Sequence, residues 1–253
     1  MDRISAFAYT QARLQARQGM RPDTDTWRRL SATHDLAALL REARETTLRP
    51  WVLALEAGFT VHQLEAALRQ AFRRHVAMTA SWQPRDWRPA VCWVQHLPLL
   101  PALQHLLSGN NAYPWMADDP ALKPYAQTEP GARLMQLQQS GLAPLANAWR
   151  ADIPLLAGWR QHWRRLWPPA PKALGARLDA LADAIENHLA AMADKADADG
   201  WHLRETMEAQ LSLAFHHHIQ QPMAVFLHLA LVALDLERLR AALVERALFP
   251  ATE

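Results

Sequence analysis

Proline and tryptophan are concentrated in the middle of this 253-residue chain. Thirteen of the seventeen prolines and eight of the eleven tryptophans lie between Trp82 and Pro171. Proline has no backbone N–H and breaks a helix interior, so this segment can form only short helices and turns. Because the large aromatic side chains need burial, we expect ordered, anchored turns in this segment and not a flexible linker.

The regions on either side have the composition and spacing of helices. Alanine, leucine, arginine, glutamine and glutamate recur, and no window alternates apolar and polar residues with a period of two. Before the proline-rich middle, we expect helices over residues 4–18, 24–30 and 35–46 and from residue 61 onward, with N-caps at Asp23 and Thr60. The chain is therefore predicted to be all-α and to begin as an array of short helices.

The C-terminal part is predicted to be an amphipathic helical block. Apolar residues recur there at spacings of three and four: Leu174, Leu178, Leu181, Ile185, Leu189 and Met192. A last helix is expected from Pro222 to Leu248, and its first half is apolar on every side, which is typical of a buried helix. The stiff tract 167–171 is the predicted boundary between residues 1–167 and 168–253, and one continuous domain is the alternative.

Charge and hydropathy limit the cellular location and the partners. The 27 lysines and arginines exceed the 25 acidic residues by only two and are scattered, so nucleic acid binding is not predicted. The first 17 residues carry early charges without an apolar run, and the longest apolar stretch, Met223–Leu234, is too short to span a bilayer. The single cysteine, Cys92, excludes an internal disulfide. We expect a cytoplasmic protein without a transmembrane segment.

The motifs of common enzymes are missing. The twelve histidines do not form the two-histidine helical motif of zinc proteases or the Glu-x-x-His pairs of di-iron bundles, and no glycine-rich phosphate loop or Gly-x-Ser-x-Gly elbow occurs. The run His216–His218 points in three directions on a helix, so a polar helix end is favoured over a metal site. The sequence predicts no catalytic residue, no cofactor and no metal ligand. A metal-dependent hydrolase that uses this run with Glu205 or Glu208 is the enzyme alternative.

A stripe of tryptophans is a candidate for packing or for recognition. Trp159, Trp163 and Trp167 are spaced by four and so lie on one side of a helix. Burial in the core is the more common role of such a stripe, whereas protein interfaces also use tryptophan as an anchor. Both roles remain open at this point.

Motifs near both ends of the chain resemble a known family. Near the N-terminus stand Tyr9-x-x-Ala12-Arg13-x-x-Ala16, a leucine helix at 36–40, Thr46-Thr47 and Leu64-Glu65-x-x-Leu68. Near the C-terminus stand Pro222-x-x-x-Phe226-Leu227 and the run Asp235-Leu236-Glu237-Arg238-Leu239-Arg240. In this order the motifs resemble the C-type central-stalk connector of A-type and V-type rotary ATPases, which is the d-type connector of the eukaryotic enzyme. Leu48 and Arg238 depart from the family pattern, and the chain is shorter than a typical three-lobed member.

The resemblance implies a non-catalytic connector that serves ion transport. It would have a funnel-like, multi-lobed all-α fold that seats the central shaft on the membrane rotor ring, so shaft and rotor-ring subunits would be its protein partners at the inner face of the membrane. Structural or interaction roles are then expected for a set of residues from the matched motifs: Tyr9, Arg13, Glu65, Asp235 and Arg240. The alternative is a stand-alone helical adaptor or assembly factor with the same fold.

Overall fold

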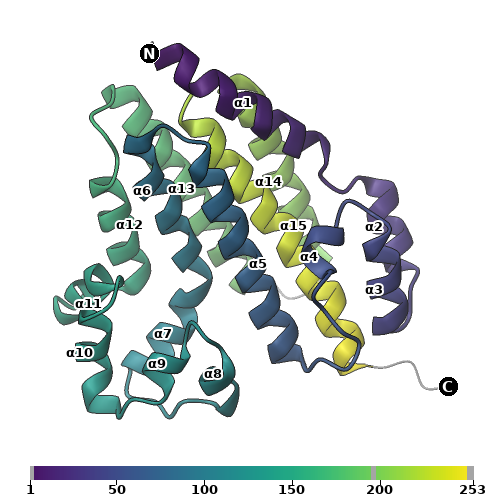
Figure 1. Ribbon diagram of the computed structural model, residues 1–253, viewed down its shortest axis with the longest axis horizontal. Helices are drawn as coiled ribbons and strands as arrows, with labels where there is room; N and C mark the ends of the chain where they lie inside the picture. The colour runs from purple at the N-terminus through teal and green to yellow at the C-terminus, as the bar shows by residue number, and fades with distance from the viewer. Residues whose placement is uncertain (1–2, 195–197, 250–253) are drawn as a thin grey trace. The chain divides into compact units, whose positions relative to one another are not determined.

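The computed structural model describes residues 3–194 and 198–249 and confirms the all-α fold (Figure 1). Within these ranges the chain forms α-helices, short 3-10 helices and turns, with no strand. None of the helices in these ranges is both long enough and apolar enough to cross a membrane.

The chain divides into two compact units, and the division differs from the predicted one. Unit 1 combines Met1–Val91 with Pro168–Glu253, whereas unit 2 is Cys92–Trp167. The end of unit 2 coincides with the start of the proline tract, as predicted. The first helices belong with the C-terminal block because they pack on the last helix, and contacts between residues so distant in sequence leave no local signal.

Unit 1 is built around its last helix, α15 (Met223–Leu248). Helices α5 (Val61–Ser81) and α14 (Ala198–His217) make the most extensive contacts with α15, and α1 (Arg3–Gly19), α13 (Lys172–Asp194) and α3 (Leu36–Arg44) also contact it (Figure 1). The N-terminal half of α15 is buried nearly throughout, from Met223 to Leu229. Its apolar surface on every side therefore fits its central position.

Side-chain caps fix where the short helices of unit 1 begin. Asp23 Oδ1 accepts a hydrogen bond of 2.7 Å from the Thr26 N–H at the start of α2 (Thr24–Ser31), and Asp35 Oδ1 accepts one of 2.8 Å from Ala38 at the start of α3. Thr60 and Gln63 form a capping box at the start of α5. Helix α4 (Arg49–Val52) carries proline in its first turn.

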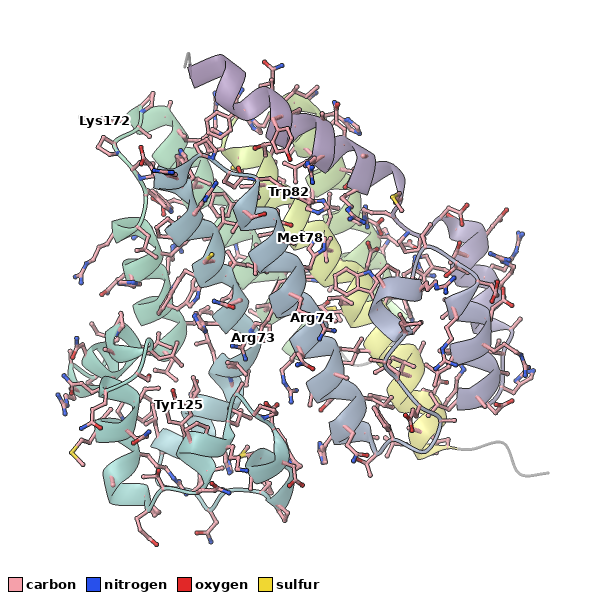
Figure 2. All side chains as sticks on the ribbon, viewed as in Figure 1. Arg73, Arg74, Met78, Trp82, Tyr125 and Lys172 are labelled. Carbon is pink, nitrogen blue, oxygen red and sulfur yellow. The ribbon has the colours of Figure 1, made fainter. Side chains whose placement is uncertain are left out.

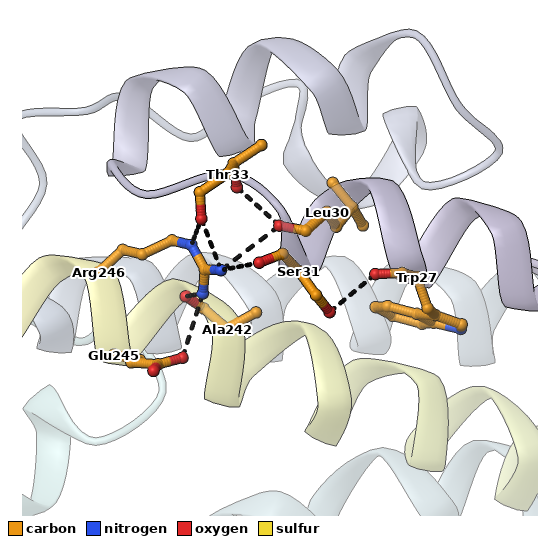
Figure 3. Close-up of polar contacts among 7 residues, drawn as sticks. All are labelled: Trp27, Leu30, Ser31, Thr33, Ala242, Glu245 and Arg246. Atoms are coloured by element: carbon orange, nitrogen blue, oxygen red, sulfur yellow. Dashed lines mark hydrogen bonds and ion pairs between the residues drawn. The ribbon is translucent and has the colours of Figure 1, made fainter.

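An arginine of α15 closes the other end of α2. Figure 3 shows the Arg246 guanidinium donating hydrogen bonds to the backbone carbonyls of Leu30 and Thr33, at 3.4 and 2.9 Å for Nη2. Its Nε also donates to Thr33 O at 3.1 Å. A cation at the C-terminus of a helix satisfies carbonyls that lack intrahelical partners, so Arg246 ties the C-terminal part of α15 to the N-terminal region.

Unit 2 shows why a proline-rich sequence can still be helical. Four of its short helices carry proline in the first turn, where the missing N–H leaves no hydrogen bond unmade: α7 (Leu100–Leu107), α8 (Pro114–Asp118), α9 (Lys123–Ala126) and α11 (Ala143–Arg150). Helices α10 (Arg133–Gln138) and α12 (Leu155–Arg165) complete the array, together with the 3-10 helices η2 (Val94–Leu99) and η3 (Pro130–Ala132). The remaining elements, η1 (Arg85–Trp87) and α6 (Arg88–Trp93), lead into unit 2.

The tryptophans of α12 belong to the core of unit 2. Trp159 and Trp163 are 5% and 3% exposed, and their rings stack with centroids 5.5 Å apart. The indole Nε1 of Trp93 donates to the carbonyl of Trp159 at 3.1 Å, and the Nε1 of Trp159 donates to the carbonyl of Trp93 at 3.2 Å. This reciprocal pair anchors α12, so the core role is the one that the structure shows for Trp159 and Trp163.

Candidate functional site

The residues singled out from the sequence lie at separate places. The Arg13 guanidinium lies over the ring of exposed Tyr9, 4.6 Å from its centroid, and 5.4 Å from the ring of Trp82. Glu65 of α5 accepts a hydrogen bond of 2.7 Å from the Nε of Arg240 of α15. The first cluster is a stacked surface pair, and the second joins two of the helices that carry the family resemblance.

Asp235 is the predicted residue that leads to an enclosed site. Its two carboxylate oxygens accept hydrogen bonds of 2.7 and 2.8 Å from Nε and Nη2 of Arg21, which follows α1. The same Nη2 donates to Glu208 of α14 at 2.8 Å. The side chains of Arg21 and Asp235 are only 10% and 9% exposed. A buried ion pair costs desolvation energy, so its presence calls for a local reason.

Burial and pairing act in opposite directions on this ion pair. Burial raises the pKa of the Asp235 carboxyl, although the hydrogen bonds and charge of Arg21 oppose the shift. Burial by itself would lower the pKa of Arg21, but the hydrogen bonds and charges of Asp235 and Glu208 outweigh it and raise that pKa. The raised pKa of Asp235 favours its neutral form, whereas the raised pKa of Arg21 favours a charged pair. The bidentate geometry decides for the charged pair, because both oxygens of Asp235 accept hydrogen bonds, as in a carboxylate bound to a guanidinium.

This ion pair borders a cavity of about 330 Å³ in unit 1. One stripe of α5 and one stripe of α15 line it, with the segment around the end of α1 and the segment around α4. The lining residues are Arg17, Met20, Arg21, Pro22, Thr47, Pro50, Trp51, Ala71, Arg74, His75, Met78, His228, Val232 and Asp235. The volume is at the lower end of the roughly 300–1,000 Å³ that is usual for ligand pockets.

Two histidines meet at this cavity. His75 Nε2 of α5 and His228 Nε2 of α15 lie 3.1 Å apart, so one ring donates and the other accepts. The pKa of His75 is lowered to about 4, mainly by burial and also by the charge of Arg17. The pKa of His228 is lowered to about 3 by burial, by His75 and by Arg21 and Arg17. Both rings are therefore neutral near pH 7. His228 Nδ1, although buried, has no hydrogen-bond partner in the part of the chain that the structure describes.

Two arginines of the cavity differ from Arg21 because no carboxylate pairs with them. Arg17 of α1 is half-buried, and its Nη2 lies 3.9 Å from the sulfur of Met78. Arg74 of α5 is exposed, and Figure 2 shows it one turn before Met78 on the same helix. Among residues 3–194 and 198–249, neither guanidinium forms an ion pair. These two side chains leave positive charge at an otherwise largely apolar cavity.

The metal-dependent alternative finds little support in this arrangement. Within the described ranges, no group of three or more His, Cys, Asp or Glu side chains is placed to hold a metal ion. Glu208, one of the residues proposed for such a site, instead pairs with Arg21. His218 Nδ1 lies 3.2 Å from Gln221 Oε1 near the end of α14.

Of the cavity's polar residues, sequence reasoning found Asp235 but missed Arg17, Arg21, Arg74, His75 and His228. The available signal was His228, an ionisable residue within the apolar run Met223–Leu234. Comparison of the chain with models of known families, with curated proteins and with solved structures finds no match. The cavity itself is therefore the basis for a functional proposal.

Proposed function

We propose that the protein is a non-catalytic binding protein whose cavity in unit 1 accepts a small organic anion. The observation that carries the proposal is the pair Arg17 and Arg74, which border the cavity from two helices without a carboxylate partner in the described chain. Guanidinium groups bind carboxylates and phosphates through paired N–H donors. A dication is disfavoured there, since the nearest carboxylate, Asp235, is already neutralised by Arg21.

The remaining walls suit the apolar part of such a ligand. Trp51, Met20, Met78 and Val232 contribute aromatic, thioether and aliphatic surface. Trp51 and His75 pack with ring centroids 5.1 Å apart, which holds both rings at the wall. A few polar groups within an apolar enclosure is the usual composition of a small-molecule site.

The engagement of the ionisable groups supports binding over catalysis. A general base needs a lone pair directed at the reacting group, and a neighbouring acid or carboxylate usually orients it. Here the two histidines bond to one another, and both oxygens of Asp235 are held by Arg21. The cavity offers charge and shape but no nucleophile paired with a base.

The test is ligand-induced stabilisation with a panel of small aryl and alkyl carboxylates, sulfonates and phosphates. A ligand at 100 times its Kd stabilises a protein by about 2.7 kcal/mol, which raises the Tm of a chain of this size by about 5–10 °C. Arg17→Gln should remove the shift, whereas Arg28→Gln, a change in an exposed residue of α2, should keep it. A panel in which no anion raises Tm would refute the proposal.

A connector role in a rotary ATPase is the second proposal. The motifs that carry the resemblance lie on α1, α5 and α15 of the same unit, and Glu65 and Arg240 join two of them. Co-purification of the untagged protein with shaft and rotor-ring subunits at the inner face of the membrane would support this role. If those subunits are present in the lysate but do not co-purify, the motor role is refuted and the adaptor alternative is the one to pursue.

A further inference from the structure

We infer that the ligand of the unit 1 cavity carries a doubly negative head group, which Arg17 and Arg74 bind together. The inference rests on the proposed anion site and adds the charge of the ligand and the role of each arginine. Arg17 is the inner contact and Arg74 is the contact at the rim.

The distribution of charge around the cavity supports two negative charges. Three arginines and one aspartate line it. Arg21 is held by Asp235 and by Glu208, so it has little capacity left for a ligand. Arg17 and Arg74 remain, and the neighbouring His75 and His228 are neutral and bonded to each other. The two guanidinium groups can thus be neutralised together by one dianion.

The two arginines differ in exposure, and so their contributions to binding should differ. Arg17 is half-buried against Met78, so its charge has lost part of its hydration before any ligand arrives. Arg74 is exposed and retains water when the cavity is empty. A monoanion is expected to bind Arg17 and leave Arg74 in solvent, whereas a dianion gains from both.

The shape of the cavity indicates what accompanies the head group. A volume of about 330 Å³ beside Trp51 and Met20 leaves room for one ring or a short branched chain. The ligand class is therefore a small aryl or alkyl dianion, such as a phosphomonoester or a geminal dicarboxylate. These two head groups share the chemistry that a pair of guanidinium forks recognises.

Three probes with the same ring separate charge from shape. Phenyl phosphate and phenylmalonate are dianions near pH 7.5, and benzenesulfonate is a monoanion. Isothermal titration calorimetry would give the Kd of each for the wild type and for Arg17→Gln, Arg74→Gln and Arg73→Gln. The last variant is the matched control, since Arg73 precedes Arg74 on α5 (Figure 2) but does not line the cavity.

The expected result is that at least one dianion binds about 10- to 100-fold more tightly than benzenesulfonate, as a second charge-assisted contact allows. Arg74→Gln should remove this preference while leaving benzenesulfonate within about twofold, and Arg17→Gln should weaken all three probes. Arg73→Gln should change nothing. The dianion that binds more tightly identifies the head group as phosphate or dicarboxylate.

Two results would overturn the inference, and they differ in what they say about the proposed function. Equal binding of all three probes, or a preference that survives Arg74→Gln, refutes the dianion but leaves the anion site in place. Failure of every probe to bind the wild type refutes both. Arg74 is exposed, so the decisive variant should fold, and circular dichroism checks that it does.

Discussion

Acid should destabilise unit 1 through the pair His75 and His228. In the folded protein their pKa values lie at about 4 and about 3, whereas an unfolded histidine titrates near 6.5. Between these values the unfolded chain binds more protons than the folded one, so stability rises with pH. The stability is complete above pH 6.5. It is lost as pH falls from there towards 4 for His75 and towards 3 for His228.

The magnitude follows from these pKa differences. Between pH 7 and pH 5, each histidine stays neutral in the folded state while its unfolded counterpart becomes almost fully protonated. Each should therefore contribute a loss of about 2 kcal/mol, or about 3–4 kcal/mol for the pair. Neighbouring charges do not relieve the cost of protonation. Arg17, Arg21 and Arg74 oppose another positive charge, and the carboxylate of Asp235 is already paired.

The assay is urea unfolding of the wild type and of the double variant His75→Phe/His228→Leu at pH 7, 6 and 5. The other histidines titrate in both proteins, so the difference between the two pH profiles isolates the pair. His34→Gln, a change in an exposed histidine, controls for the loss of any imidazole. The variant should lose about 3–4 kcal/mol less than the wild type on going from pH 7 to pH 5. Parallel profiles would show that the pair is already protonated or solvated, and the reasoning about the cavity would fail.

Three other substitutions test packing and pairing within each unit, each by its free energy of unfolding in urea. Gly158→Ala should cost about 1–3 kcal/mol, because the new Cβ would lie 2.3 Å from the Cβ of Ala148 and force α11 and α12 apart; an unchanged midpoint would contradict that close approach. Arg246→Met should cost about 1.5–3 kcal/mol by releasing the carbonyls at the end of α2, and a loss below about 0.5 kcal/mol would contradict the cap. Asp235→Asn should cost about 3 kcal/mol, since Arg21 stays buried with only Glu208 as a partner, and a neutral effect would contradict the charged pair.

Local signals in the sequence were enough to predict the helices of unit 1. Helix α2 begins after the predicted cap Asp23 and α5 after the predicted cap Thr60, and Pro222 precedes the first residue of α15. These signals are local, since a cap and its partner lie within three residues of each other. The helix expected over 35–46 ends at Arg44, within the usual uncertainty of a helix terminus.

The site could not be predicted in the same way, because its partners are distant in sequence. Arg21 and Asp235 are 214 residues apart, and His75 and His228 are 153 residues apart. None of these residues belongs to a spaced motif, and arginine and histidine are common on helix surfaces. Asp235 was singled out only through the resemblance, while its ion pair with Arg21 depends on how α15 lies against the segment that follows α1.

The position of the polar residues on α15 indicates that they serve the cavity and not the fold. His228 and Asp235 are seven residues apart, or two helical turns, and Val232 lies between them on the same stripe. All three line the cavity. A helix packed on every side would be held at least as well by leucine at these positions, because replacing a buried ion pair with apolar residues is often neutral or stabilising. The neighbouring positions Leu227, Leu229, Leu231 and Leu234 are apolar and buried. The two polar interruptions of this apolar surface thus face the same enclosed space, which is the arrangement expected of a binding site.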